Sequence, residues 1–545
     1  MPRPDGSSPS AVSIARRASL VVLGIALLYA SAHFVWLVTH YNRTFVHPDF
    51  YGHIVQETVL NGLGLHWSDA LYAIQIRSPG ESRPRFLAYA IEAVDQKIRL
   101  FLYRFVVVPP TFLPIAWILQ LVVAPWCLFE LMKTLTESRG AALAAVVVYV
   151  TSVGFLSGFS MSLLQGKALS HVALLLVLYL MSRLHARARE GELFSEIPSP
   201  LRYAVLAVLL GGLFLDEMPW FAFPLSVVMF PSLFLPASRP RRSAGAMIRN
   251  GLVFVLPVVV FLFIVLVVVP PVTQRYFGLR FDYLGNVFAR GTQAMGAKSP
   301  FEGPHAVFGA ATVWENFTTL FGVSLVPWQV SPFVKSPYGD YPGTQVMNAA
   351  KIAVFVIVFG LLGLTALRTG VGGRLLRRVI VVTVLFLVFL SLVSIRHIPV
   401  STGYYYGSSF AAVFALLIGA WYASVEASGR AVASVIVAAM VLGIALVQTD
   451  NFAPINHGWM DTHHELVARP RYRAKLPLAP PRDVTAAELH DIWRAWRGRW
   501  LDAYLAERTI SVGAVYLVVE LQTIDRVRAA TPPAASSARR RRGGR

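Results

Sequence analysis

The sequence predicts an all-α, polytopic integral membrane protein with about eleven transmembrane helices. Hydrophobic residues make up 55% of the 545 positions and charged residues only 14%, whereas soluble domains carry about 25% charged residues. The mean hydropathy is +0.57. Apolar runs of roughly 18 or more residues, long enough to cross the hydrocarbon core of a bilayer, recur along most of the chain. These observations exclude an ordinary cytosolic enzyme.

The apolar runs define the expected spans in order. They are residues 20–40, 105–132, 141–158, 169–181, 203–215, 220–235, 252–270, 352–367, 379–394, 410–424 and 431–447. The first run follows Arg16 and Arg17 and is longer than the apolar region of about 7–15 residues in a signal peptide, so we interpret it as an uncleaved anchor. The single cysteine, Cys127, lies inside an apolar run and excludes an intrachain disulfide.

Lys and Arg in the short segments predict the orientation of these spans. The segments on the side of the N-terminus carry 18 of them, namely Arg3, Arg16, Arg17, Lys133, Arg139, Arg183, Arg187, Arg189, Arg202, Arg239, Arg241, Arg242, Arg249, Arg368, Arg374, Arg377, Arg378 and Arg430. The opposite short segments carry Lys167 and Arg396, with Lys351 at a helix edge. The net charge of +20 is therefore explained largely by a cytoplasmic N-terminus and anionic lipid headgroups, and no nucleic-acid partner is predicted.

This orientation gives the expected organisation of the chain. A cytoplasmic N-terminus (1–19) precedes a transmembrane domain (20–448) with two long outward loops, 41–104 and 271–350. A small extracytoplasmic C-terminal region (449–530) and a disordered basic tail (531–545) follow. The expected location is the plasma membrane, the inner membrane in a bacterium, with the functional site on the extracytoplasmic side.

The outward loop after the first span carries the first candidate site. Asp49 lies between His47 and His53, with Glu57 following, just outside the membrane. Such a carboxylate suits a general base, or a ligand of a metal ion. An equally simple interpretation is a solvated turn in which Asp49 caps the next helix.

An amphipathic helix is expected later in the same loop, at residues 87–104, with Pro84 near its start. The spacing places Phe86 and Phe101 on its apolar face and Arg85 and Asp95 on its polar face. Arginines here, with Arg83 just before, suit bidentate binding of a lipid phosphate, and they equally suit attraction to anionic headgroups.

Three further groups of candidates lie at span ends predicted to face outward. The first is the acidic pair Asp216 and Glu217 between two spans, which suits ligand binding or simply marks a turn. The second, Arg396 and His397 before Tyr404, suits phosphate or sugar binding, or an interfacial aromatic belt. The third is the short second outward loop, where Lys167 lies near Gln165, Ser170 and His171 and provides either a phosphate contact or helix capping.

The arrangement resembles the GT-C superfamily of membrane glycosyltransferases, especially the branch of protein O-mannosyltransferases and lipid A aminoarabinose transferases. Asp49 stands where those enzymes place a catalytic acid in the first outward loop, and residues 85–104 resemble their interfacial helix. Residues 165–171 and 211–224 are similar to the family's second outward loop and to its glycine-rich helix and turn. The similarity covers about the first half of the chain.

The resemblance implies transfer of a sugar from a polyprenyl-phosphate donor to a hydroxyl of a glycan, lipid or protein acceptor. In one inverting step, Asp49 deprotonates the acceptor and basic side chains stabilise the leaving phosphate. Family members that use a metal usually have an acidic residue in the second outward loop, where this chain has Gln165 and Lys167. A divalent metal is therefore doubtful, and no cofactor is predicted with certainty.

Two other functions stay open. In a polysaccharide polymerase or ligase of the O-antigen type, Arg275, Arg280 and Arg290 of the second long loop bind a lipid pyrophosphate and Asp49 is incidental. In a transporter or flippase of a lipid-linked sugar, internal repeats and charges within spans are typical. The sequence has no evident repeat, and its charges gather at span ends, which favours chemistry at the membrane surface.

Overall fold

The computed structural model describes residues 9–40, 84–102, 113–160, 165–189, 191–216, 218–235, 244–277, 280–285, 344–367, 371–393 and 399–468. Across these ranges regular secondary structure is helical and there is no β-strand, so the all-α class is confirmed for the described part of the chain. Side chains are described for most of these residues.

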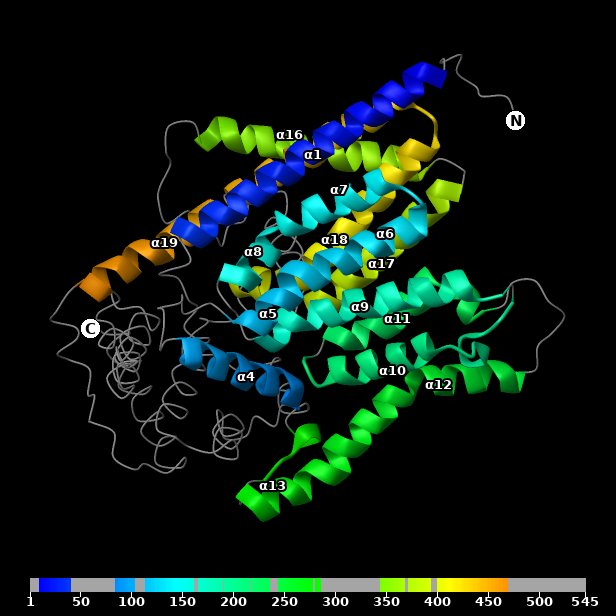
Figure 1. Cartoon of the computed structure of the whole chain (residues 1–545), viewed down its shortest axis with the longest axis vertical. Coiled ribbons are helices and arrows are strands. Elements are labelled where there is room, and N and C mark those ends of the chain that lie inside the picture. Colours follow the sequence, from blue (N-terminus) through cyan, green and yellow to red (C-terminus); the bar gives the residue numbers. More distant parts are fainter. Residues whose placement is uncertain are drawn as a thin grey trace, which may run out of the picture.

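The helices form a bundle in which successive long helices run in alternating directions (Figure 1). In chain order they are α1 (Pro9–His40), α4 (Phe86–Leu102), α5 (Pro114–Ile118), α6 (Ala124–Thr136), α7 (Arg139–Val150), α8 (Val153–Ser160), α9 (Gln165–Arg187), α10 (Pro200–Leu213), α11 (Ala222–Met229), α12 (Ala244–Phe263), α13 (Val269–Phe277), α16 (Thr344–Ala366), α17 (Val371–Val393), α18 (Pro399–Ala427) and α19 (Ala431–Ala468). Short π-helical turns, Leu119–Val123 and Ile264–Val268, join α5 to α6 and α12 to α13.

Six helical segments of the described part are long and apolar enough to cross a membrane. They are Ser13–Trp36, Pro114–Thr136, Leu169–Arg187, Ala244–Arg275, Phe410–Ala427 and Val432–Asp450. Shorter apolar helices cover Arg139–Val150, Pro200–Leu213, Pro219–Met229 and Val356–Ala366. The chain is thus a helical membrane protein, and the number of eleven spans stays a prediction.

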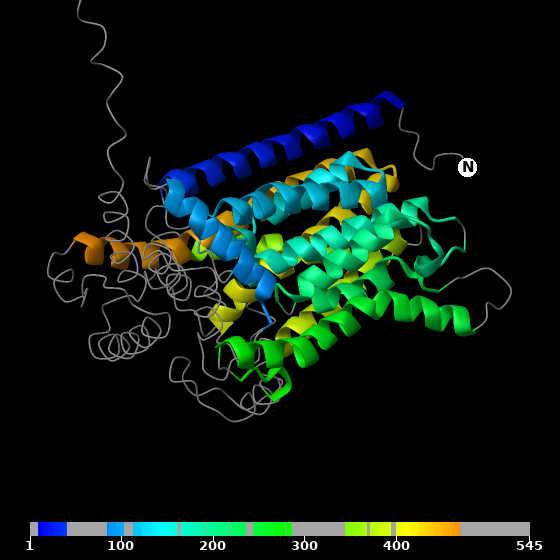
Figure 2. The same cartoon turned by 60° about the horizontal axis from the view of Figure 1, so that its bottom comes forward.

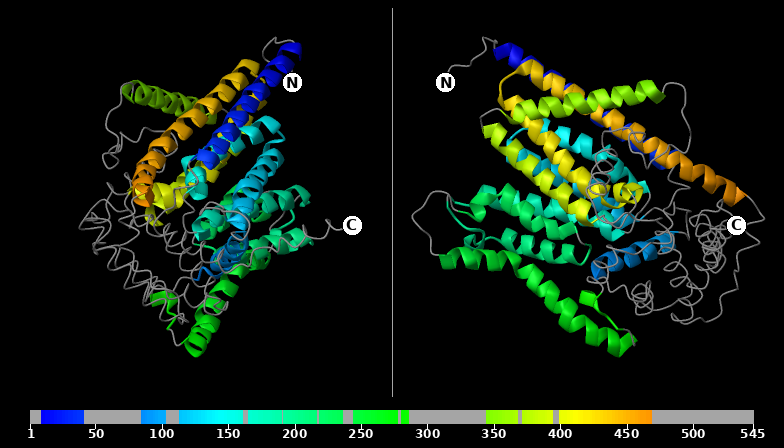
Figure 3. Two further views of the ribbon diagram at one scale, coloured as in Figure 1. Left: turned by 60° about the vertical axis from the view of Figure 1, so that its left-hand side comes forward. Right: turned by 180° about the vertical axis from the view of Figure 1, so that it is seen from behind.

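Helix α18 is the centre of the bundle. All residues from 410 to 422 are buried, as expected of a helix that is apolar on every side. It packs along α7, α8 and α17 (Figure 3). Small residues make this approach close, since a Cβ added to Gly419 lies only 2.8 Å from Met132 Cε and 3.0 Å from the Ala141 carbonyl oxygen. By contrast, Val21, Ile25, Leu28 and Val35 form an exposed apolar face on α1, as a lipid-facing helix requires.

Two predicted spans are interrupted. The expected span 141–158 breaks at Thr151 and Ser152, and the Ser152 hydroxyl accepts the Phe155 N–H at 3.1 Å to cap α8. The expected span 220–235 is a 3₁₀ turn, the short helix α11 and a second 3₁₀ turn at Pro231–Leu233. Pro231 supplies no N–H, and Phe230 before it leaves the helical region with φ −124° and ψ 54°.

The first and last expected spans are shorter than the helices that contain them. Helix α1 begins at Pro9, inside the expected N-terminal segment 1–19, and α19 continues to Ala468, well past the expected boundary at 448. Cross-helix hydrogen bonds hold α19 at that boundary: Thr151 donates to Gln448 at 2.8 Å and Tyr29 shares a 2.6 Å bond with Thr449. The Gln448 Oε1 and the Thr449 hydroxyl therefore have hydrogen-bond partners inside the bundle, whereas the buried Gln448 Nε2 has none within the described residues.

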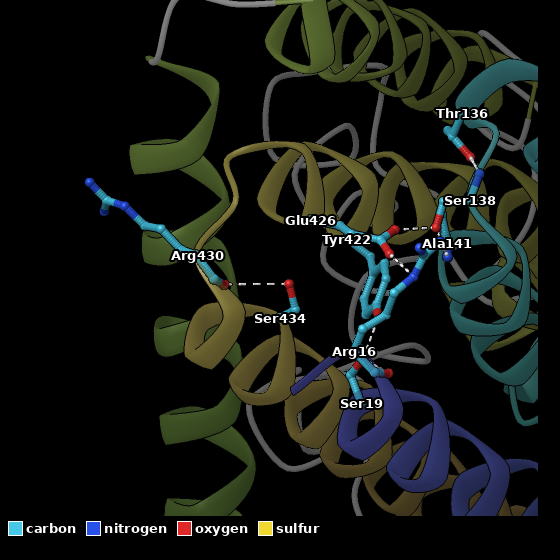
Figure 4. A network of polar contacts seen from close by, with 9 residues as sticks. All are labelled: Arg16, Ser19, Thr136, Ser138, Ala141, Tyr422, Glu426, Arg430 and Ser434. Atoms are coloured by element: carbon cyan, nitrogen blue, oxygen red, sulfur yellow. Dashed lines mark hydrogen bonds and ion pairs between the residues drawn. The ribbon is translucent and has the colours of Figure 1, made fainter. Parts of the chain in front are cut away.

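A polar network ties three helices together at the end of the bundle where α1 begins (Figure 4). Glu426 of α18 forms a 3.2 Å ion pair with Arg16 and accepts a hydrogen bond from Ser138, which also caps α7 by accepting the Ala141 N–H. The Tyr422 hydroxyl donates to Ser19 at 2.9 Å. Because Lys133, Arg139 and Arg430 flank these residues in the sequence, several of the basic segments predicted to be cytoplasmic meet at this end.

Candidate functional site

The opposite end of the bundle is where α1 ends and α5 and α9 begin, and we call it the outward end because the charge distribution predicts that it faces outward. Helix α4 lies across this end, with its axis inclined to the helices of the bundle (Figures 1 and 2). It packs against α5 and α9. The predicted amphipathic helix at 87–104 is therefore present, with bounds Phe86–Leu102.

A buried ion pair holds the start of α4. Arg85 Nη2 lies 2.7 Å from Asp216 Oδ1 in the turn that follows α10, and the two side chains are only 7% and 1% exposed. The backbone adds a second link, because the Leu87 N–H donates to the Phe214 carbonyl oxygen at 3.1 Å. Removal of either partner is strongly destabilising, since it leaves an uncompensated buried charge.

A second buried carboxylate joins the middle of α4 to the next helix. Asp95 is fully buried, and its two oxygens accept the N–H groups of Ile115 at 2.7 Å and Ala116 at 3.1 Å. These are among the first backbone N–H groups of α5, which have no partner within their own helix. Asp95 thus caps α5 from another helix, and its negative charge is stabilised by the N-terminal end of the α5 dipole.

The predicted orientation of the two faces of α4 is wrong for Arg85 and Asp95. The sequence pattern places both on a polar face open to water, but both are buried against the bundle. The apolar residues Leu87, Val94 and Phe101 are exposed instead. The physical reason is that their partners, Asp216 and the start of α5, lie far away in the sequence, so local periodicity carries no information about them.

Aromatic side chains surround the Arg85 end of α4. The Phe86 ring lies 6.0 Å from that of Phe214 and 6.1 Å from that of Phe281, measured between centroids, and Phe214 lies 5.0 Å from Phe261 of α12. This cluster joins α4, α10 and α12 to the short segment 280–285. Phe86 and Phe214 are close in sequence to Arg85 and Asp216, and the low exposure of that ion pair strengthens the electrostatic attraction within it.

The described residues of the expected second outward loop are helical. Gln165, Lys167, Ser170 and His171 all lie in the first two turns of α9. His171 is fully buried, and its Nε2 shares a 2.5 Å hydrogen bond with the Tyr149 hydroxyl at the end of α7. His171 therefore links two helices inside the bundle, and the Lys167 side chain lies outside the described part.

Several buried or half-buried polar residues at this end are absent from the sequence prediction. Thr151, Gln448, Thr449 and Tyr29 form the hydrogen bonds that join α1 and α19 to the break between α7 and α8. Gln120 is buried in the π-helical turn between α5 and α6, and its Oε1 has no hydrogen-bond partner in the described structure. A signal for such residues is a Gln or Thr inside an otherwise apolar run, because an unsatisfied polar group there is costly.

Most of the predicted site residues lie outside the described residues. They are His47, Asp49, His53, Glu57, Arg83, Glu217, Arg396 and His397. Tyr404 lies in the first turns of α18, and its side chain is likewise not described. Of the candidates, the structure brings Arg85 and Asp216 together, and it makes Arg85 a partner of a carboxylate.

The described residues offer few other candidates for binding a metal ion or a phosphate. Among the described residues, no group of three or more His, Cys, Asp and Glu side chains is placed to hold a metal ion. Arg275 and Arg280, which the polymerase alternative uses, are both exposed at and beyond the end of α13. Comparisons of the chain with known protein families, with curated protein sequences and with solved structures find no match.

Proposed function

We propose that the protein is an extracytoplasmic-facing glycosyltransferase that moves a sugar from a polyprenyl-phosphate donor to an acceptor hydroxyl. Asp49 is the general base, which removes the proton of the acceptor hydroxyl as its oxygen attacks the anomeric carbon. The bond from the sugar to the lipid phosphate breaks in the same step. The leaving phosphate is already anionic and needs stabilisation by positive side chains more than it needs a proton.

The observation that supports the proposal is the construction of the outward end. Helix α4 lies across this end, its apolar residues Leu87, Val94 and Phe101 are exposed, and Arg85 and Asp95 are buried against the bundle. A helix with this arrangement suits the boundary between lipid and water, where a lipid-linked substrate presents its headgroup. In the sequence, α4 is the last part of the predicted outward loop 41–104, and Asp49 lies near the start of the same loop.

The ion pair between Arg85 and Asp216 affects which basic side chains can stabilise the leaving phosphate. Arg85 is paired with Asp216, so the positive charge that we assigned to the phosphate is largely neutralised. Arg83, Lys167 and Arg396 remain the proposed phosphate contacts, with His47, His53, Glu57, Glu217, His397 and Tyr404 as proposed sugar or acceptor contacts. Arg280 takes the phosphate role in the polymerase or ligase alternative, which its exposure at the end of the bundle permits.

Parallel activity assays on two variants test the proposal. Membranes containing equal amounts of wild type, Asp49→Asn and Arg280→Ala are supplied with a labelled polyprenyl-phosphate sugar and acceptor lipids or glycans. Loss of a general base typically costs about a hundredfold or more in rate, so Asp49→Asn is expected to lose transfer while Arg280→Ala retains it. The exposed Asp282→Asn is the matched control. Full activity of Asp49→Asn contradicts the proposal, and selective loss in Arg280→Ala favours the polymerase or ligase.

A further inference from the structure

Helix α4 is joined to the bundle by charged side chains at two separate points along its length. At its start, Arg85 pairs with Asp216 in the turn after α10, and ten residues later Asp95 caps α5. The partners of α4 thus come from two parts of the chain that are more than 90 residues apart. All three charged side chains are at least nine-tenths buried.

Burial of charged side chains costs desolvation free energy, and α4 already has an apolar face available for packing. Exposed apolar residues such as Leu87 and Phe101 show that α4 does not use all of its apolar surface for packing. Burial of an ion pair adds little net stability, because desolvation offsets most of the attraction, but the geometry it selects is narrow. The pair therefore serves to define position and orientation more than to increase stability.

We propose that Arg85, Asp216 and Asp95 act as a clamp of positioning residues, which holds α4 in one place across the outward end and so fixes the end of the segment that carries Asp49. This inference rests on the proposed function for its effect on transfer, but the clamp itself is a statement about α4. The clamp also accounts for Asp216 at the turn after α10: the acidic group neutralises Arg85 and need not contact substrate.

Exchange of the two charges tests the clamp. Arg85→Asp and Asp216→Arg each place two like charges together, whereas the double variant restores an oppositely charged pair in reverse order. Cysteines replacing Phe86 and Phe214, whose ring centroids lie 6.0 Å apart, report the docking of α4 through a short bis-maleimide in a Cys127→Ala background. Linked peptides are quantified by mass spectrometry, which requires no enzymatic activity.

Each single variant is expected to lower the cross-linking yield and kcat/KM for the lipid-linked donor by roughly tenfold or more, the coupling expected of contacting charges. The double variant is expected to recover both. Glu130→Gln, which removes an ion pair with Lys133 whose side chains are 21% and 42% exposed, is the matched control and is expected to change neither. Cross-linking that persists in both single variants, or a double variant no better than the worse single variant, contradicts the clamp.

Two further measurements distinguish failure of the clamp from failure to fold and from failure of the proposed function. If a single variant does not accumulate, Arg85→Met/Asp216→Leu replaces it, since a pair without charge leaves no buried ion and is expected to fold. That variant is expected to show reduced cross-linking, and an unchanged yield contradicts the clamp. If the wild type transfers no sugar, the proposed function fails while cross-linking still decides whether the clamp exists.

Discussion

The cap that Asp95 provides to α5 gives a prediction whose size follows from the structure. In Asp95→Ala, the N–H groups of Ile115 and Ala116 lose acceptors at 2.7 and 3.1 Å. An unsatisfied buried donor costs about 1–3 kcal/mol, and the favourable interaction with the helix dipole, up to about 2 kcal/mol, is lost as well. We expect a loss of about 3–5 kcal/mol at this junction, and roughly half of that in Asp95→Asn, which keeps one acceptor oxygen.

Amide hydrogen exchange measures this loss locally. With the cap removed, the peptide that contains Ile115 and Ala116 is expected to exchange about 150-fold to several thousandfold faster, because local opening becomes easier by that free energy. Thermal denaturation in detergent is expected to shift downward by several degrees. Asp282→Ala is the matched control, since Asp282 is exposed and also accepts a backbone N–H, that of Gly285, at 2.8 Å. Exchange at Ile115 and Ala116 that is equal in Asp95→Ala and the control refutes the reasoning.

Two other predictions concern packing and buried polar groups. In Gly140→Ala, the new Cβ lies 2.6 Å from Tyr422 Cε1, so the variant is expected to lose about 1–3 kcal/mol by overpacking, whereas Gly24→Ala meets no atom within 4 Å and is expected to melt like the wild type. Equal melting temperatures of the two variants contradict this account. Thr151→Val leaves the buried Gln448 Oε1 without its donor and is expected to cost about 1–3 kcal/mol. Gln448→Leu is expected to cost less, because the Thr151 hydroxyl also donates to the Val147 carbonyl oxygen at 2.8 Å, and the double variant is expected to cost less than the sum of the two. Additive losses in a thermal double-mutant cycle contradict the coupling.

The sequence predicts the helical class and the positions of the long apolar helices, because a run of apolar residues is a local property. It also predicts the existence of α4, because the amphipathic spacing of residues along a helix is likewise a local property. It does not predict that Arg85 and Asp95 are buried, since their partners at Asp216 and at Ile115 become neighbours only through the fold. The continuation of α19 past Gln448 is missed in the same way, because Tyr29 and Thr151 supply the hydrogen bonds that a lone helix lacks.

In the candidate site, too, the sequence predicts local features and misses contacts between distant residues. The sequence predicts that charged and aromatic residues gather at the outward end. Only the structure reveals that Arg85 pairs with Asp216. The assignment of Asp49 rests on its position after the first predicted span and on the family resemblance, and it stays a prediction.

The fate of the bond between sugar and lipid phosphate tests the central claim most directly. Purified protein in proteoliposomes is supplied with a polyprenyl-phosphate sugar labelled in both the sugar and the phosphate, together with acceptor. Wild type is expected to release labelled polyprenyl phosphate in step with a glycosylated acceptor of inverted anomeric configuration, and Asp49→Asn is expected not to. Movement of the intact lipid-linked sugar across the bilayer with no bond cleaved, or equal cleavage by Asp49→Asn, contradicts the central claim.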